Sequence, residues 1–289
     1  MPRCLFFAVF LLVIVLAPIA ESHASEPEPG VGPSKTLRDF GENLGGELID
    51  DGSYLFHSVV GDIGDMLKLP FHAGEVGVKD VLTAAVVLGT IPAMIYGLDN
   101  PLRRNTKNIP DRTAGDLVTI GTGVTEGSLG LVYGWGLLFR NDEARHAALT
   151  GIEGVGLSSL LTIGAKAAFG RLRPREEHGP RAFFKGGSSF VSGAATPTFA
   201  AAAAISEGFD NRWWVAVPAY SFALMTGVGR MGKDAHWASD VLGSAIIGAA
   251  TTELLFYLHR KREQPTSLII LPMVTDRGVP AGASLGFTW

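Results

Sequence analysis

Six apolar segments follow one another between residues 81 and 258, and they constrain the fold more than any other feature of the chain. They are rich in small residues, as in the alanine run at 200–204, and alanine favours helix. Each is longer than an ordinary strand, and the polar connections between them are short. The sequence therefore predicts an all-α fold, an antiparallel bundle of about six helices. The segments are residues 81–98, 117–139, 147–169, 192–206, 213–228 and 236–258.

The first 24 residues have the pattern of a secretory signal peptide. Arg3 gives a basic start, residues 5–20 form an uncharged apolar run, and the Ser-His-Ala sequence at 22–24 matches a cleavage site. The run is short for a membrane span, so an uncleaved anchor is the weaker alternative. Cys4, the only cysteine, would leave with the signal peptide. We therefore expect an exported protein that is periplasmic or membrane-associated.

Residues 25–79 are expected to form a leader ahead of the helical domain, which we place at residues 80–262. Three prolines at 27, 29 and 33, with glycines beside them, predict a flexible connection. Apolar residues then recur with mixed spacing among aspartates and glycines, which predicts short amphipathic helices. His57 and His72 lie here, and we expect surface or packing roles for both.

The tail, residues 263–289, differs in character from the rest of the chain. Apolar stretches at 268–271 and 283–289 flank the turn-forming sequence Asp-Arg-Gly at 276–278, which predicts two short strands. A terminal aromatic residue is also typical of outer-membrane barrels, but a single hairpin does not close a barrel. We expect a hairpin packed on the bundle.

Composition limits the partners and the location. The net charge is −4, without the basic excess that is typical of nucleic-acid binding. Most uncharged runs reach only about 17 or 18 residues, the lower limit for crossing a bilayer. Acidic residues also interrupt the segments, and a charge buried in lipid is costly. We expect a helical domain in the periplasm that rests on a membrane, with integral insertion as the alternative. The interrupting residues are Asp116, Glu126, Glu153, Asp240 and Glu253.

Residues 166–240 hold three clusters of charged and hydroxyl side chains. In the first, Lys166 and Arg173 are seven residues apart, so on one continuous helix they lie on nearly the same face. Pro174 ends that helix and places Arg173 at its terminus. The planar fork of arginine suits bidentate contact with phosphate, and lysine acts as a point charge. Alone, such a pair is more typical of a solvated surface.

The second cluster is Ser192-Gly193, at the start of the fourth apolar segment. Serine is favoured as a helix N-cap. The free N–H groups of a helix start, with a hydroxyl beside them, also bind an anion. Gly193 would let the backbone approach an oxyanion closely. The capping role and the binding role are compatible.

The third cluster contains Arg230, His236 and Asp240. His236 and Asp240 are four residues apart, so on a helix they share a face. A carboxylate that accepts from one imidazole nitrogen fixes the tautomer and leaves the other nitrogen free to attack. A lone pair of this kind is more often structural. Arg230 adds a donor for phosphate oxygens, and cationic donors are the main device of phosphoryl transfer.

Together, the order and spacing of the clusters resemble the signature of the type-2 phosphatidic acid phosphatase and vanadium haloperoxidase superfamily. That signature is Lys, six residues, Arg-Pro; then Pro-Ser-Gly-His; then Ser-Arg, five residues, His, three residues, Asp. The resemblance covers about residues 81–258 and implies the family's all-α bundle and a hydrolysis that needs no metal or other cofactor. It implies that His236 is the nucleophile, forming a phospho-histidine, and that Asp240 orients it. The residues implied to hold the phosphate are Lys166, Arg173, Ser192, Gly193 and Arg230.

Three positions depart from that signature. Val191 replaces proline and Gly229 replaces serine, and we expect both changes to be tolerated. Ala194 replaces the second histidine, which in the family protonates the leaving oxygen. General-acid catalysis is typically worth about 10²–10⁴-fold in rate. Without it, an ester with an alkoxide leaving group should be hydrolysed slowly, and the rate should fall less for an ester with an acidic leaving group.

Three functions are compatible with Ala194. One is a working phosphatase whose proton donor lies elsewhere, with His178 the nearest candidate, although a solvated loop histidine fits that position better. The others are a slow phosphatase limited to activated leaving groups, and a protein that only binds phosphate or a phospholipid headgroup. Vanadate-dependent peroxidase chemistry fits least, because it uses the same histidine. We predict hydrolysis of a phosphate monoester, with a lipid phosphate as the leading substrate class, and the binding protein as the alternative.

Overall fold

The computed structural model describes residues 33–68, 78–263, 268–274 and 280–287. The predicted signal peptide at 1–24 and most of the proline-containing connection lie outside the described residues. The chain divides into two compact units, Met1–Leu255 and Phe256–Trp289. The first unit contains all three polar clusters.

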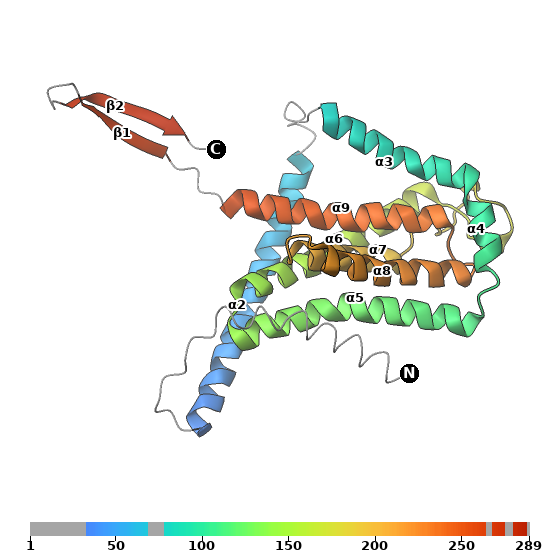
Figure 1. The fold of residues 1–289 in the computed structure, drawn as a ribbon, viewed down its shortest axis with the longest axis horizontal. Helices are drawn as coiled ribbons and strands as arrows, with labels where there is room; N and C mark the ends of the chain where they lie inside the picture. The colour runs from blue at the N-terminus through green and yellow to red at the C-terminus, as the bar shows by residue number, and fades with distance from the viewer. Residues whose placement is uncertain (1–32, 69–77, 264–267, 275–279, 288–289) are drawn as a thin grey trace. The chain divides into compact units, whose positions relative to one another are not determined.

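Five helices form the body of the first unit (Figure 1). α5 (Asp111–Phe139) packs along α8 (Trp213–Gly232), and α7 (Ala195–Glu207) contacts α5, α6 (Asp142–Phe169) and α8. The first part of α9 (Ala238–Glu263) completes the body. Most of α7 is buried, which makes this alanine-rich helix the centre of the core.

The predicted all-α fold is confirmed, since each of the six apolar segments contains a helix. α3 (Val78–Gly97) corresponds to the first segment, and the short helix α4 (Asp99–Thr106) lies in what the sequence suggested was only a connection. α6 begins before its apolar segment because Asn141 caps it, accepting from the backbone N–H of Ala144 at 2.9 Å.

Small residues let the helices of the body approach closely. A Cβ atom at Gly229 of α8 would lie 2.6 Å from the carbonyl oxygen of Ala114 of α5, which no real contact allows. Between α6 and α9, a Cβ atom at Gly154 would lie 2.4 Å from the hydroxyl oxygen of Thr252. These two glycines therefore serve helix–helix packing.

The leader contains one long helix, α2 (Pro33–Lys68), where the sequence predicted several short ones. A glycine inside a helix costs only about 1 kcal/mol relative to alanine, so glycines alone do not break it. Contacts to the body also support α2: the carboxyl group of Asp51 accepts from the hydroxyl of Tyr133 at 2.7 Å and pairs with Arg145 at 3.1 Å. His57 of α2 is exposed, and His72 lies outside the described residues.

The described part of the second unit contains a hairpin. β1 (Leu268–Val274) pairs antiparallel with β2 (Pro280–Phe287), with Leu268 opposite Phe287. The predicted pair of strands is confirmed. Its packing on the bundle stays a prediction.

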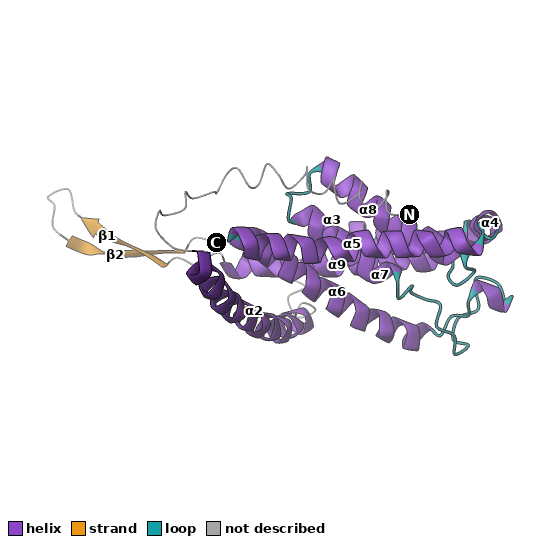
Figure 2. Ribbon diagram, turned by 90° about the horizontal axis from the view of Figure 1, so that it is seen from below, coloured by secondary structure: helices purple, strands orange, loops and turns teal. Residues whose placement is uncertain are grey.

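The loops that carry the polar clusters gather at one end of the bundle, the end where α4 lies (Figure 2). Arg103 of α4 ties two of these loops together. Its guanidinium donates to Asp234, at 2.6 and 2.7 Å, and to Glu177, at 2.7 Å. These ion pairs raise the pKa of Arg103. They hold α4 beside two loops, the one that follows the short 3₁₀ helix η2 (Pro174–Glu176) and the one that precedes α9.

Candidate anion-binding active site

A buried network of charges joins the loops at this end. Arg171, just after α6, uses all five N–H groups of its guanidinium. It donates to Asp240, to Asp99 at 2.7 Å, to the hydroxyl of Ser239 at 2.8 Å and twice to the carbonyl oxygen of Pro180. Asp99 also accepts from the N–H and the hydroxyl of Ser239, at 2.8 and 2.6 Å. Asp99 is 1% exposed and the others are fully buried, so the network fixes Asp240 firmly in place.

His236 lies two residues before α9, and a backbone carbonyl holds its ring. Nδ1 lies 2.8 Å from the carbonyl oxygen of Ser189 and 3.7 Å from Oδ2 of Asp240. The sequence predicted that Asp240 accepts a hydrogen bond from this ring, but 3.7 Å is too long for one. The reason is that α9 begins only at Ala238, and Oδ2 already accepts from the Ser189 hydroxyl and the Trp237 N–H. If Nδ1 carries the proton and donates it to the carbonyl, Nε2 keeps its lone pair.

The surroundings favour a neutral imidazole beside an ionised carboxylate. Burial lowers the pKa of His236, and the charges of Arg230 and Lys166 act in the same direction against the influence of Asp240. Burial alone would raise the pKa of Asp240, but its contacts with His236 and Arg171 outweigh that effect and hold the pKa below its usual value. Neutral imidazole is the form that can attack an electrophile.

Three cations gather around His236. Nη2 of Arg230 lies 3.4 Å from Nε2 of the imidazole. Lys166 and Arg173 meet at Ser188, where Nζ donates to the carbonyl oxygen at 2.7 Å and Nη2 donates to the hydroxyl at 3.1 Å. Ser188 precedes Ser189, whose carbonyl oxygen lies beside Nδ1, so both cations contact the loop segment that lies against the imidazole.

Lys166 and Arg173 do not share a helix, which corrects the sequence prediction. α6 ends at Phe169, and Gly170 adopts a left-handed conformation with φ of 46° that only glycine accepts readily. A Cβ atom there would also lie 3.1 Å from the N of Gly186. The chain turns at Gly170, and the loop brings Arg173 back toward Lys166.

The cations influence one another. Burial and the neighbouring Arg173 lower the pKa of Lys166 to about 8, and Arg230 adds to the effect. Burial, with Arg173 and Arg175, also lowers the pKa of Arg230. Like charges held together and partly out of water are unfavourable, and an anion between them relieves the repulsion. The arrangement is therefore suited to bind an anion.

Ser192 and Gly193 lie just before α7, which begins at Ala195. The predicted cap at Ser192 is wrong, because the N-cap residue of α7 is Ala194. Ser192 is fully buried, and its hydroxyl accepts from the backbone N–H of Ala195 at 3.4 Å. Gly193 is exposed, and a Cβ atom there would meet Cε of Lys166 at 3.7 Å, an ordinary contact. Packing within the described chain therefore does not require glycine at 193, although Gly193 borders the cation cluster.

The departures from the family signature have different surroundings. Serine does not fit at Gly229 without movement, because α5 and α8 touch there. Val191 is fully buried. Ala194 is the N-cap residue of α7 and offers no side-chain hydrogen bond. His178 is exposed, and its Nδ1 lies 2.5 Å from the carbonyl oxygen of Glu176, which fits a solvated loop residue.

The sequence did not predict the residues that hold the charged side chains of the site in place. In the sequence, Arg171 is one of several cations in a basic loop, and Asp99 comes directly after an apolar segment. Nothing in the sequence around Ser189 and Ser239 indicates that these serines contact the site. A partial signal was present, because Arg171 lies between Lys166 and Arg173 inside the first cluster. No spacing in the sequence indicates that Asp99 joins it from 72 residues away.

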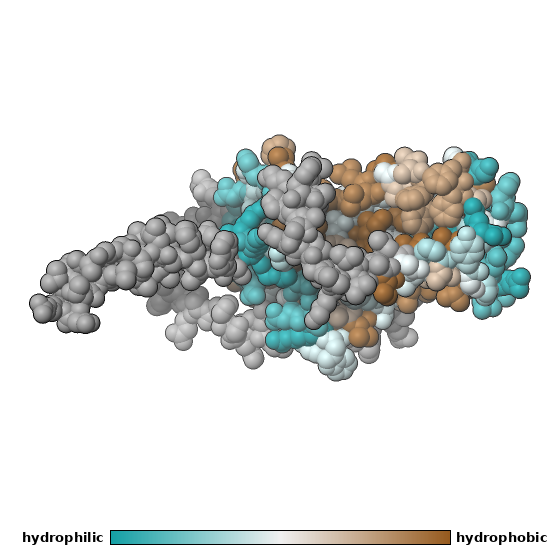
Figure 3. Space-filling view, turned by 90° about the horizontal axis from the view of Figure 1, so that it is seen from above, coloured by the Kyte–Doolittle hydropathy of each residue, from teal (hydrophilic) through white to brown (hydrophobic). Residues whose placement is uncertain are grey.

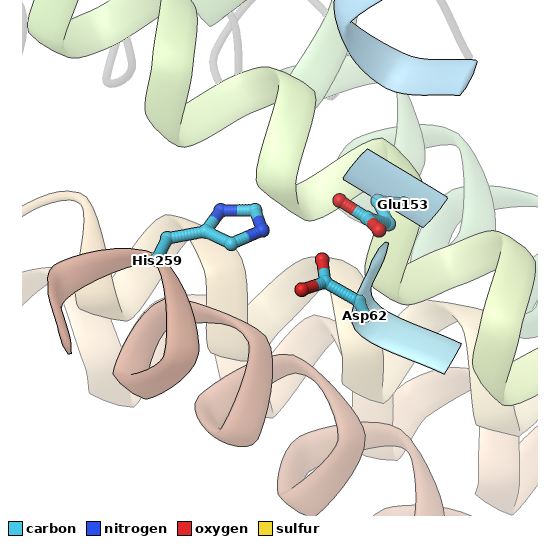
Figure 4. A group of neighbouring side chains, drawn as sticks. All are labelled: Asp62, Glu153 and His259. Atoms are coloured by element: carbon cyan, nitrogen blue, oxygen red, sulfur yellow. The ribbon is translucent and has the colours of Figure 1, made fainter. Parts of the chain in front are cut away.

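A second group of carboxylates lies between α2 and α6, away from the loops. Figure 4 shows the carboxyl groups of Asp62 and Glu153 close together, and their oxygens come within 4.8 Å. The hydroxyl of Ser58 lies 3.2 Å from Asp62 and 3.0 Å from Glu153. This contact joins α2 to the body, and two acidic side chains do not by themselves define a ligand site.

The chain is similar to proteins that are already known. Over 125 residues the chain is 32% identical to the lipid A 1-phosphatase of Porphyromonas gingivalis, a match that covers 43% of this chain and 24% of that protein. The chain thus spans about a quarter of the length of the curated relative that it matches. Two solved structures are also similar. LpxE of Aquifex aeolicus has 22% identity and a TM-score of 0.44, over 56% of this chain and 96% of that one. The transmembrane PAP2-type phosphatidylglycerolphosphate phosphatase of Bacillus subtilis has 19% identity and a TM-score of 0.48, over 64% of this chain and 97% of that one.

Residues 147–264 match the model of the PAP2 superfamily, and this range contains all three polar clusters. The resemblance that the sequence indicated is therefore confirmed: the chain carries a domain of the PAP2 superfamily.

Proposed function

We propose that the chain hydrolyses a phosphate monoester, with a lipid phosphate as its substrate class. The observation that carries the proposal is the cluster of Lys166, Arg173 and Arg230 beside Nε2 of a neutral His236. The cluster offers positive charge for the phosphate oxygens and a nucleophile for the phosphorus atom. The PAP2 superfamily match over the same residues supports the assignment.

In the proposed reaction, Nε2 of His236 attacks phosphorus, and the ester P–O bond breaks with its electron pair on the leaving oxygen. The three cations stabilise the charge on the phosphoryl oxygens. The N–H group of Gly193 adds a donor near the start of α7, whereas the N–H of Ser192 already donates to the hydroxyl of Ser244 at 2.8 Å. Asp240 stabilises the imidazole as it becomes positive. Water then attacks the phospho-histidine, which releases phosphate and frees His236.

Membrane association belongs to the proposal. Two stretches of the described chain, Asp142–Glu176 and Ala238–Arg262, each contain a helix long and apolar enough to cross a membrane. Hydrophobic residues gather on part of the face seen in Figure 3. Large apolar side chains of α5, α6 and α8 are exposed, among them Leu138, Leu160 and Trp213. The named lipid A phosphatase supports a lipid substrate. Export to the periplasm through the signal peptide also remains our proposal, and carbonate extraction of membranes tests whether the chain is integral or peripheral.

The alternative is a protein that binds phosphate or a phospholipid headgroup without hydrolysing it. Ala194 is the observation that favours this alternative, because its side chain supplies no proton to a leaving oxygen. Both functions use the same cations. They differ only in whether phosphate is released.

A phosphate-release assay with the full chain separates the two functions. We expect turnover of an activated aryl phosphate and of a lipid phosphate, and a loss of at least about 10⁴-fold in His236→Ala, as when a nucleophile is removed from other enzymes. His57→Ala is the matched control, because His57 is exposed on α2. Vanadate binding without turnover of either ester would favour the binding protein.

A further inference from the structure

The proposed reaction needs a proton for the leaving oxygen, and few groups in the described site can supply one. Arg173 and Arg230 are effectively never deprotonated. His178 is turned to the carbonyl oxygen of Glu176 on an exposed stretch of loop. The side chain of Ala194 carries no proton to give. Lys166 remains.

Lys166 lies in the last turn of α6, and its ammonium group reaches the loop that contains Ser188. Within the described chain it makes one hydrogen bond, from Nζ to the carbonyl oxygen of Ser188 at 2.7 Å. An ammonium group has three donors, so two N–H groups are left to face a ligand. The aliphatic part of the side chain runs beside Gly193, next to Ala194, since a Cβ atom at 193 would lie 3.7 Å from Cε.

The charges around Lys166 make the proton available. Burial and Arg173 lower the pKa of its ammonium group to about 8, Arg230 acts in the same direction, and Asp240 opposes them. At neutral pH the group is mostly protonated, yet close enough to its pKa to release a proton. General acids work best when their pKa lies near the operating pH.

We infer that Lys166 is the proton donor to the leaving oxygen. The inference rests on the proposed hydrolysis at His236. As the N–P bond forms and the P–O bond breaks, the leaving oxygen takes a proton from Nζ, which gives an alcohol and a neutral amine. In the second step, the amine takes a proton from the attacking water, and the electron pair of the N–P bond returns to Nε2. Protons and electrons balance without any further reactant.

The choice of leaving group tests the inference. Lys166→Arg keeps the positive charge but cannot release a proton at neutral pH. We expect it to lose about 10²–10⁴-fold in kcat/KM on an alkyl phosphate, and less than about 10-fold on p-nitrophenyl phosphate, whose leaving group needs no proton. Arg173→Lys changes only the binding of the phosphate group. It should therefore lower kcat/KM by similar factors for the two esters. Lys185 lies on the exposed part of the same loop, so Lys185→Arg should leave kcat/KM unchanged for both esters.

A second measurement uses the unaltered chain. The pH dependence of kcat/KM reports the ionisation of the free enzyme, so activity on the alkyl ester should fall as the pH rises through about 8. Activity on the aryl ester should fall less steeply in the same range. Adding an imidazole with Ala194→His should recover alkyl ester hydrolysis in the Lys166→Arg background, because a second donor then replaces the first.

Equal losses on the two esters in Lys166→Arg, or no loss, would overturn the assignment to Lys166. A selective loss on the alkyl ester in His178→Ala would assign the proton to His178 instead. If the unaltered chain releases phosphate from neither ester, the proposed function itself is wrong, and the inference falls with it.

Discussion

Arg171 and Arg173 stand two residues apart in one loop, and their surroundings are opposite. Arg171 is fully buried, and every N–H group of its guanidinium meets a protein acceptor. Arg173 is partly exposed, and within the described chain its guanidinium makes one hydrogen bond, to Ser188. Arg171 therefore holds the loops together, whereas Arg173 has further donors, which in the proposed function bind phosphate. Two identical side chains in one motif divide into a structural charge and a binding charge.

The largest effect should come from breaking the buried network. Arg171→Gln leaves the carboxylates of Asp99 and Asp240 buried without their cation, and removing one partner of a buried ion pair costs about 3–5 kcal/mol. We expect the free energy of unfolding to fall by about that amount. Denaturant unfolding of the purified full chain measures it.

Arg173→Gln is the matched variant for that comparison. It removes the same side chain from a partly exposed position, so its free energy of unfolding should change by less than about 1 kcal/mol. Equal destabilisation by the two variants would contradict the division into structural and binding charges.

The next effect concerns anion binding. Arg173→Gln and Arg230→Gln each remove charge-assisted hydrogen bonds of about 1.5–3 kcal/mol, so the affinity for phosphate or vanadate should fall roughly 10- to 100-fold. Calorimetric titration measures the change. Lys185→Gln serves as the control, since it removes a cation from the same loop outside the cluster. An affinity that falls equally in the control would indicate a diffuse electrostatic effect.

The sequence predicted the helices and the cations of the site because both depend on local patterns. Apolar runs rich in alanine identify α5 to α9, and the spacing of the three clusters identifies Lys166, Arg173, Arg230, His236 and Asp240. The partners of these residues are determined by tertiary packing, which produces no repeating pattern in the sequence. Asp99 reaches Arg171 only because α4 folds beside the loop, and Ser189 reaches His236 only because α9 begins two residues late.

A smaller effect appears in the pH dependence of stability. The pKa of Lys166 is about 8 in the folded chain and about 10.4 when unfolded. Between these values the unfolded chain holds a proton that the folded chain has released, so stability should rise with pH in this window. Because Lys166 is partly exposed, we expect a gain of about 1 kcal/mol relative to Lys166→Met, which lacks this titration. Denaturant unfolding at pH of about 7.5 and about 10 measures this gain in the unaltered chain and in Lys166→Met. Saturating phosphate should reduce the gain, because it favours the charged form of the amine.

The smallest effect on stability should come from Gly193→Ala. The added Cβ would meet only Cε of Lys166 at 3.7 Å, so the free energy of unfolding should change by less than about 0.5 kcal/mol. Gly229→Ala, by contrast, places a Cβ 2.6 Å from the carbonyl oxygen of Ala114 and should cost about 1–3 kcal/mol. If Gly193 serves to bring the backbone near an oxyanion, its alanine variant should weaken phosphate binding while the fold stays intact. If Gly193→Ala binds phosphate with unchanged affinity, Gly193 is not part of the binding site.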